Sequence, residues 1–300
     1  MKKIVVLGSM NMDLTILADP FPKKGETVTG SDYAQIPGGK GANQAVATGR
    51  MGADVSFISA CGNDSFGDTL IKELKLSNVK TQNILRKEAH TGIALIVRES
   101  DGDNRIIIAS GANHLILPDD LENIKKDIEN ADFLLLQLEI PMETVEYAAA
   151  VAKNSNTIVI LDPAPAVKLS DKLLSNIDFL LPNEHELDLI LENITGTLEE
   201  KAKILNHKGV GTLILTEGDK GVTIISKSGK TKINAPIMNA VDTTAAGDTF
   251  AGAFVYGLAN DWEVTKAAEF AVKAASLSVT KIGAQSSIPW LKEVALLEIK

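Results

Sequence analysis

The sequence predicts an α/β fold in which helices cover both faces of a mostly parallel central sheet. Short apolar segments rich in β-branched residues alternate with segments of helical length along most of the 300 residues. Unbroken apolar strands are typical of strands buried on both faces, and their alternation with helices favours parallel pairing. Strands are expected at residues 4–7, 55–60, 133–137, 157–162, 179–182, 212–216 and 222–225. Helices are expected at residues 41–51, 66–76, 118–129, 142–153 and 198–208.

Two segments interrupt this alternation and are expected to form short exposed strands inserted in a single domain of residues 1–300. They span residues 14–37 and 92–109. In the second segment, β-branched residues flank a turn that contains Asp101 and Gly102, which is a strong hairpin signal. A small sheet over a binding edge suggests a lid, and its apolar outer face predicts a protein partner. We therefore expect a homodimer formed through these two segments.

The composition is that of an ordinary globular enzyme. Hydrophobic residues make up 45% of the chain and charged residues 23%. The formal net charge of −9 argues against a general binder of nucleic acid or of membrane surfaces. No apolar stretch approaches the length of a transmembrane helix. Cys61 is the only cysteine, so no disulfide can form within the chain, which fits a cytoplasmic protein.

Polar residues follow the carboxyl ends of several expected strands. They occur at residues 11–13, 137–139, 162–163, 183–186 and 216–218. Open parallel sheets bind ligands outside the carboxyl ends of their strands, so these positions predict one polar binding edge. In the first of these positions, alternation turns Asn11 and Asp13 to the same side. Such a pair suits the hydroxyls of a polyol, but it is equally typical of a simple turn.

The segment of residues 241–250 predicts an anion site beside a base. Ala245, Ala246 and Gly247 let a ligand approach the backbone closely, and a helical pattern begins at Asp248. The first N–H groups of a helix have no partner within it and can hold a phosphate there. A carboxylate beside that phosphate could accept a proton from an attacking hydroxyl. The residues alone leave a second reading open, in which Asp248 and Thr249 only cap the helix.

A second glycine-rich loop shifts the balance towards phosphoryl transfer. It reads Gly-Gly-Lys-Gly-Ala-Asn-Gln over residues 38–44. It is no P-loop, because Gly41 follows Lys40 where a Ser or Thr would have to bind magnesium. It is no dinucleotide fingerprint either, because the glycine spacing differs and no strand is expected to lead directly into it. Asn43 offers donors and an acceptor that suit sugar hydroxyls, although a tight turn before a helix is an open alternative.

Together these segments resemble the ribokinase family of sugar and nucleoside kinases, the PfkB group. Residues 38–67 resemble one family signature, residues 242–254 resemble the other, and the likeness continues through residues 281–290. The resemblance implies a ribokinase-like three-layer αβα fold with a small β-sheet lid. It implies ATP-dependent phosphorylation of D-ribose at its 5-hydroxyl. Fructokinase or deoxyribokinase activity is the alternative, and a sugar sensor without catalysis is a weaker one.

The resemblance also implies a role for particular residues in the reaction. Asp248 would be the general base, with Ala245, Ala246 and Gly247 as the anion hole for the γ-phosphate. The sugar would be held by Asn11, Asp13, Gly39, Lys40, Gly41, Ala42, Asn43 and Glu139. Lys40 is the only basic residue among them, which disfavours a phosphosugar as substrate.

The same resemblance implies ATP, Mg²⁺ and a monovalent cation, K⁺, as cofactors. Asn183 and Glu186 match the family's Asn-x-x-Glu motif and would place Mg-ATP through water molecules. The nucleotide would be flanked by Thr216, Gly218, Gly221 and Gly247. Val272 stands where a polar residue near the adenine would be expected. Potassium would be held by Asp242, Thr244, Ser278, Lys281, Gly283 and Ser287, largely through backbone oxygens.

Overall fold

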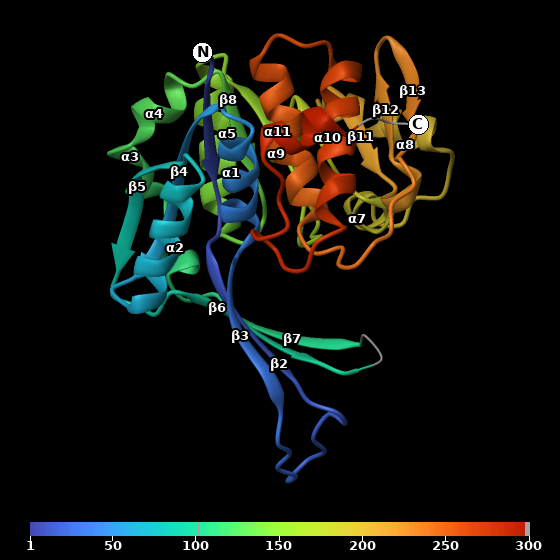
Figure 1. Ribbon diagram of the computed structural model, residues 1–300. Coiled ribbons are helices and arrows are strands. Elements are labelled where there is room, and N and C mark those ends of the chain that lie inside the picture. Colours follow the sequence, from blue (N-terminus) through green and yellow to red (C-terminus); the bar gives the residue numbers. More distant parts are fainter. Residues whose placement is uncertain (101–102, 298–300) are drawn as a thin grey trace.

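The computed structural model describes residues 1–100 and 103–297 and has a three-layer αβα architecture (Figure 1). Within these residues the main sheet has the strand order β13-β12-β11-β10-β9-β8-β1-β4-β5. Its strands are β1 (Lys3–Leu7), β4 (Asp54–Gly62), β5 (Lys80–Lys87), β8 (Phe133–Leu136), β9 (Ile158–Leu161), β10 (Phe179–Leu180), β11 (Thr212–Thr216), β12 (Val222–Ser226) and β13 (Gly229–Ile233). Pairing is parallel from β5 to β11 and antiparallel at β12 and β13.

All seven strands expected from apolar segments are present, and two edge strands were not predicted. β5 carries polar residues at most positions and is half exposed, while β13 is exposed along nearly its whole length. An edge strand buries less of its surface than a central one, so it needs no continuous apolar sequence. The periodic pattern that predicts the central strands is therefore missing from these two.

Helices cover both faces of the main sheet. They are α1 (Lys40–Arg50), α2 (Ser65–Leu76), α3 (Pro118–Glu122), α4 (Lys125–Glu129), α5 (Met142–Asn154), α6 (Asp171–Leu174), α7 (Glu184–Ile190), α8 (Leu198–His207), α9 (Ala246–Ala259), α10 (Val264–Ser278) and α11 (Leu291–Leu296). The single helix expected at residues 118–129 is wrong, because a turn separates α3 from α4. In that turn Ile124 N–H bonds the Leu121 carbonyl, three residues back instead of four. In the described part of the chain, no helix is both long and apolar enough to cross a membrane.

Strand β1 shows how the two helical layers are held to the sheet. Its alternate side chains point to opposite faces, so Ile4 and Val6 join one buried cluster and Val5 and Leu7 the other. The first cluster includes α1, α9 and α10, and the second includes α5, α7 and α8. Strands buried on both faces need apolar residues at every position, which is the pattern of the sequence.

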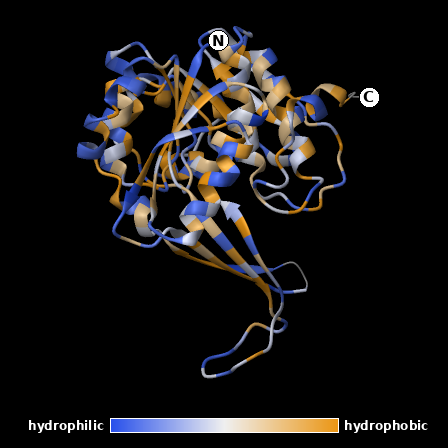
Figure 2. Ribbon diagram, turned by 60° about the vertical axis from the view of Figure 1, so that its left-hand side comes forward, coloured by the Kyte–Doolittle hydropathy of each residue, from blue (hydrophilic) through white to orange (hydrophobic). Residues whose placement is uncertain are grey.

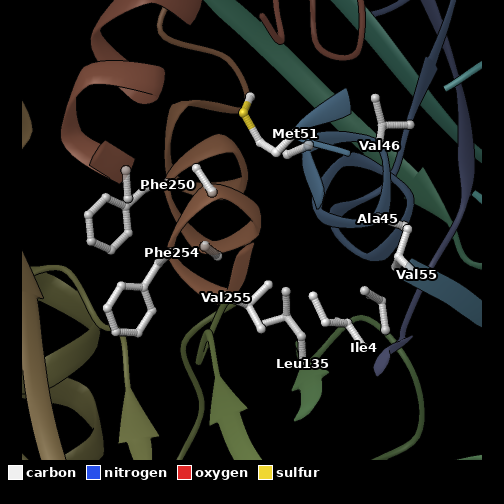
Figure 3. Packing of buried hydrophobic residues seen from close by; sticks show 14 of the residues in the cluster. Ile4, Ala45, Val46, Met51, Val55, Leu135, Phe250, Phe254 and Val255 are labelled. Atoms are coloured by element: carbon white, nitrogen blue, oxygen red, sulfur yellow. The ribbon is translucent and has the colours of Figure 1, made fainter. Parts of the chain in front are cut away.

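Helices α1 and α9 pack closely against each other on one face of the sheet (Figure 3). The close-up shows Phe250 and Phe254 on the side of α9 turned away from α1, and Val255 pointing towards Leu135 and Ile4 of the strands below. Gly252 lies at the contact, where an added Cβ would be only 2.5 Å from the Cβ of Ala47. This approach fixes how the first turns of the two helices face each other.

A second, smaller sheet projects from the main body (Figure 1). In the described residues its order is β3-β2-β6-β7, with β2 (Asn11–Leu17), β3 (Ser31–Gly38), β6 (Gly92–Arg98) and β7 (Asn104–Ala109). β2 pairs with β6 in parallel, and the other two pairs are antiparallel. Figure 2 shows apolar residues along this sheet, and the exposed ones include Tyr33, Leu95, Ile106, Ile107 and Ile108. The expected turn residues Asp101 and Gly102 lie outside the described residues.

Two expectations about the small sheet are wrong. β2 begins at Asn11, three residues before the expected segment, so Asn11 and Asp13 lie within a strand and do not form a loop. β3 ends at Gly38, inside the glycine-rich segment, although the strands expected within residues 14–37 were not expected to lead directly into that loop. Both errors have one cause. Asn11 pairs with Gly38 in an antiparallel ladder that connects segments far apart in the sequence.

Candidate active site

Two adjoining cavities lie at the carboxyl ends of the central strands, as expected for an open parallel sheet. The first, of about 240 Å³, reaches Asp162 after β9, Leu181 after β10 and Thr216 at the end of β11. A larger cavity of about 380 Å³ is mostly apolar. The two share Asn183, Thr216, Thr243, Ala246, Gly247 and Phe250.

The first turn of α9 points backbone N–H groups at the smaller cavity. α9 begins at Ala246 after Ala245, which adopts a left-handed conformation with φ 59°. Ala246 donates to the Thr243 carbonyl and Thr249 to the Ala245 carbonyl. Among the described residues, no acceptor bonds the N–H groups of Gly247 and Asp248. These two donors and the helix dipole form a site for an anion.

The Asp248 side chain does not cap α9. It is buried at 5% exposure and accepts hydrogen bonds from Asn43 Nδ2 at 2.9 Å and Gln44 Nε2 at 3.1 Å. Thr249 Oγ1 donates to the Ala245 carbonyl. In the described part of the chain α9 has no side-chain cap, so the capping interpretation is wrong. The carboxylate instead faces α1, next to the anion site.

The predicted sugar residues on β2 are held in different ways. Asn11 Oδ1 accepts from Asn113 Nδ2 at 2.7 Å, and Asn113 also bonds the backbone of Met10. The amide nitrogen of Asn11 is thereby left to donate. Asp13 is largely buried, and within the described residues its carboxylate accepts no hydrogen bond. Burial first, and then the charges of Glu139 and Asp248, raise the pKa of Asp13 to about 7.

Glu139 and the glycines organise the start of α1. One oxygen of Glu139 accepts from Ser9 Oγ at 2.5 Å and from the Lys40 N–H at 3.1 Å. Gly39 has φ 87°, and a Cβ there would lie 2.7 Å from Asn11 N. A Cβ on Gly41 would lie 2.6 Å from Ser9 N. Backbone packing thus accounts for both glycines. Ala42 is fully buried too, its N–H bonding the Ser9 carbonyl at 2.8 Å.

Lys40 places a positive charge among several carboxylates at the cavity. Burial lowers the pKa of its ammonium, but Asp162, Asp248, Glu139 and Glu186 together raise that pKa above its usual value. Asp162 is itself buried, and its pKa rises to about 7. Burial is the largest cause of that rise, opposed by Lys40 and reinforced by Asp248. Acidic groups outnumber the single ammonium at this point of the cavity.

The Asn-x-x-Glu motif forms a reciprocal cap at the start of α7. Asn183 Oδ1 accepts from the Glu186 N–H at 2.8 Å, and Glu186 Oε2 accepts from the Asn183 N–H at 2.8 Å. Both residues also line the smaller cavity, so the cap aims their remaining polar atoms at it. Gly218 and Gly221 line the larger cavity together with Thr216.

Comparisons with known proteins agree with this geometry. The model of the pfkB family of carbohydrate kinases matches residues 1–291. The chain belongs to this family. It is 43% identical to a ribokinase of Haemophilus influenzae over 97% of each chain. The solved ribokinase of Thermotoga maritima is 38% identical, with a TM-score of 0.92 over 98% of each chain.

Another solved structure, an Arabidopsis thaliana ribokinase complexed with ribose and ATP, superposes on this pfkB family kinase with a TM-score of 0.93. It is 32% identical and covers 98% of this chain and 97% of its own. The ribokinase-like αβα fold with a small additional sheet, expected from the resemblance, is confirmed.

The residues predicted for a cation lie beside the anion site but outside both cavities of the described chain. Asp242 Oδ1 accepts from Thr244 N at 2.9 Å and Thr244 Oγ1 at 2.6 Å, and its Oδ2 accepts from Gly283 N at 2.9 Å. Burial raises the pKa of Asp242, but these hydrogen bonds and Arg98 bring it below its usual value. Among the described residues, no group of three or more His, Cys, Asp or Glu could hold a metal.

Three side chains of that set are turned to other partners. Ser278 Oγ donates to the Ala275 carbonyl and Ser287 Oγ to the Ala284 carbonyl. Lys281 Nζ forms an ion pair with Glu293 at 2.7 Å. The Ser278 carbonyl already accepts from the Lys281 N–H at 3.1 Å, whereas the carbonyls of Lys281 and Ser287 accept no hydrogen bond among the described residues.

The structure adds four polar residues that sequence reasoning did not select for this kinase. They are Gln44, Asn113, Gln137 and Asp162, all buried. Gln137 and Asp162 follow the ends of β8 and β9, where polar residues were noted without a role. A polar residue directly after a buried apolar strand was the signal available for these two.

Proposed function

We propose that this kinase transfers the γ-phosphoryl group of ATP to the 5-hydroxyl of D-ribose, giving ribose 5-phosphate and ADP. The observation that carries the proposal is the buried carboxylate of Asp248 beside the free N–H groups of the first turn of α9. An anion site next to a base is the arrangement that phosphoryl transfer needs. Full-length similarity to ribokinases at about 40% identity supports ribose and ATP as substrates.

The reaction is a direct displacement at phosphorus. Asp248 accepts the hydroxyl proton, the sugar oxygen bonds to phosphorus, and the bond from phosphorus to the departing ADP oxygen breaks. The N–H groups of Gly247 and Asp248 stabilise the negative charge on the transferred group. Asn11, Asp13 and Asn43 hold the sugar hydroxyls so that the reacting oxygen lies in line.

The larger cavity suits the adenosine part of ATP, because it is mostly apolar and adjoins the anion site. Val272 lines it with other apolar side chains, so the base is held there by packing. Asn183 and Glu186 would hold hydrated Mg²⁺ with the phosphates. The acidic groups around Lys40 fit this assignment, since a divalent cation offsets their repulsion of the nucleotide. Mg²⁺ supplies charge neutralisation when bound.

We extend the proposal to a potassium site between the loops at residues 242–244 and 278–287. Within the described chain, the carbonyl oxygens of Lys281, Gly283 and Ser287 accept no hydrogen bond, and the ionised Asp242 lies beside them. Hard oxygen donors with one carboxylate fit a monovalent cation. Such a cation would fix the loop that leads into α9.

The small sheet is proposed to act as a lid and as the surface of a homodimer in the cytoplasm. Its segments at residues 14–37 and 92–109 carry exposed Ile106, Ile107 and Ile108 in a row on β7. A contiguous apolar edge strand favours association. A monomer by light scattering at micromolar concentration would contradict the dimer.

The test is an assay of ADP release with ribose, 2-deoxyribose and fructose, with and without potassium. Ribose should be the best substrate. In particular, 2-deoxyribose lacks the 2-hydroxyl, so Asp13 loses a hydrogen-bond donor that ribose supplies. Asp248→Asn should lower turnover by at least about 100-fold, the scale of a lost general base, with ribose binding retained. Asp68→Asn, an exposed acid of α2, is the matched control and should stay active. Equal rates with ribose and deoxyribose would reject the ribose assignment.

A further inference from the structure

We propose that Gln44 is a positioning residue for the reaction, which fixes the carboxylate of Asp248 and is itself oriented by Gln137. The inference rests on the proposed function, in which Asp248 is the base. Gln44 lines neither cavity in the described part of the chain, whereas Asp248 lines the smaller one. Gln44 therefore contacts the base Asp248 from the side away from the cavity and does not touch the substrates.

Both N–H groups of the Gln44 amide are directed at carboxylates. Nε2 lies 3.1 Å from Oδ1 of Asp248 and 2.7 Å from Oδ2 of Asp162. The amide is fully buried on α1, so no solvent competes for these bonds. Hydrogen bonds to charged acceptors are about twice as strong as those between neutral groups. One side chain thus links the base to a second buried acid that follows β9.

Gln137 determines which way the Gln44 amide points. Only the nitrogen of an amide can donate to two carboxylates, so the oxygen of Gln44 must face away from them. That oxygen accepts a hydrogen bond from Gln137 Nε2, which is fully buried directly after β8. A flipped amide would lose this bond and place its oxygen against two acids. The orientation is therefore fixed from three sides.

The two oxygens of Asp248 are held by two neighbouring residues of α1. Gln44 bonds Oδ1, and Asn43 bonds Oδ2 at 2.9 Å. Asn43 also has a buried side-chain oxygen without a partner in the described chain, which can accept from a sugar hydroxyl. Asn43 therefore serves sugar and base together, while Gln44 serves the base and Asp162. Removing Gln44 would free Asp248 to rotate out of line.

The charged groups around the Asp248 carboxylate come from three elements. Lys40 belongs to α1, Asp13 to β2, and Asp162 follows β9. Loss of the Gln44 amide removes a hydrogen-bond donor that favours the ionised form of the base. The acidic limb of the kcat profile should then move to higher pH. A side chain that merely fills space would not have this effect.

The experiment compares Gln44→Met, which keeps the length of the side chain and removes its hydrogen bonds, with the wild-type enzyme. We expect kcat to fall about 10- to 100-fold, the range for a lost bond to a charged group. The Kd for ribose should change less than about threefold, because Gln44 does not line the cavity. Thr48→Val is the matched control: Thr48 is equally buried one turn along α1 and bonds only backbone oxygens. It should keep kcat and the pH profile.

Gln137→Leu provides an independent test at a distance from the base. Gln137→Leu should also lower kcat. The double variant Gln44→Met/Gln137→Leu should be no slower than Gln44→Met alone, because both substitutions act through the amide of Gln44. The proposal is overturned if Gln44→Met keeps the wild-type kcat and pH profile, if only its ribose affinity falls, or if the two substitutions have additive effects. If Gln44→Met does not fold, Gln137→Leu with an unchanged kcat is the overturning result.

Failure of this inference can be told apart from failure of the proposed function. Wild-type protein without activity on ribose, or Asp248→Asn with wild-type turnover, rejects the proposed function. Wild-type activity that depends on Asp248, together with unaffected variants at Gln44 and Gln137, rejects only the positioning role.

Discussion

Replacing Asp13 by asparagine should stabilise the free protein, and the gain should grow with pH. Asp13 is largely buried near Glu139 and Asp248, and its carboxylate has no donor among the described residues. Its pKa is therefore raised from 3.8 to about 7 in the folded state. Below pH 3.8 the group is protonated in both states and costs nothing. Between that pH and about 7 the unfolded chain releases the proton while the folded protein keeps it, so stability is lost as pH rises.

The size of this effect follows from the pKa difference. Each pKa unit corresponds to about 1.36 kcal/mol, so the loss reaches about 4 kcal/mol near pH 7 and stays constant above it. Asparagine does not titrate and escapes the loss. The free energy of unfolding, measured by urea denaturation from pH 4.5 to 8, should therefore favour Asp13→Asn increasingly with pH. Ribose affinity should fall in the same variant, because the carboxylate no longer accepts from the sugar hydroxyls.

A neighbouring substitution provides the control. Thr15→Val alters a buried residue of β2 whose hydroxyl has no partner among the described residues, and it changes no titratable group. Its effect on stability should be the same at every pH. A difference between Asp13→Asn and wild type that is flat with pH, or that shrinks as pH rises, would refute the reasoning.

Three further predictions concern the frame around the site. Gly252→Ala should lower the free energy of unfolding by about 1–3 kcal/mol, because the added methyl group overpacks against Ala47, and it should also lower kcat. Denaturation and turnover measurements test this, and unchanged values would contradict the close contact of α1 and α9. Phe254→Ala should cost about 3–5 kcal/mol, because the ring is fully buried, and a smaller loss in calorimetry would show that the core collapses around it. Asp242→Asn should weaken activation by potassium in the ADP-release assay, and an unchanged potassium dependence would remove Asp242 from that role.

Much of the fold was predictable because the central strands are buried on both faces. Such strands need mostly apolar residues, and the sequence shows this directly in β1, β8 and β9. The edge strands β5 and β13 were not predicted, because strands that are partly exposed do not need a continuous apolar sequence. The start of β2 was missed for a different reason. Its pairing with β3 and β6 depends on residues that only the folded chain brings together.

The candidate site was predictable to the extent that its residues lie in short contiguous segments. The loop before α9 and the loop before α1 each carry small residues and polar side chains in a recognisable order. Gln44, Gln137 and Asp162 belong to three separate segments, and each is an ordinary polar residue in its own context. Their hydrogen bonds to one another appear only when β8, β9 and α1 meet.

The sequence by itself determined the chemistry that the site can carry: small residues, a helix start and an acid within residues 245–248. The tertiary structure decided what that acid does. Local propensity allowed Asp248 to cap its own helix, but the close packing of α9 on α1 at Gly252 turns the carboxylate towards Asn43 and Gln44. Burying a carboxylate without donors is costly, and the donors of Asp248 lie about 200 residues away in the sequence, so only the folded chain could provide them.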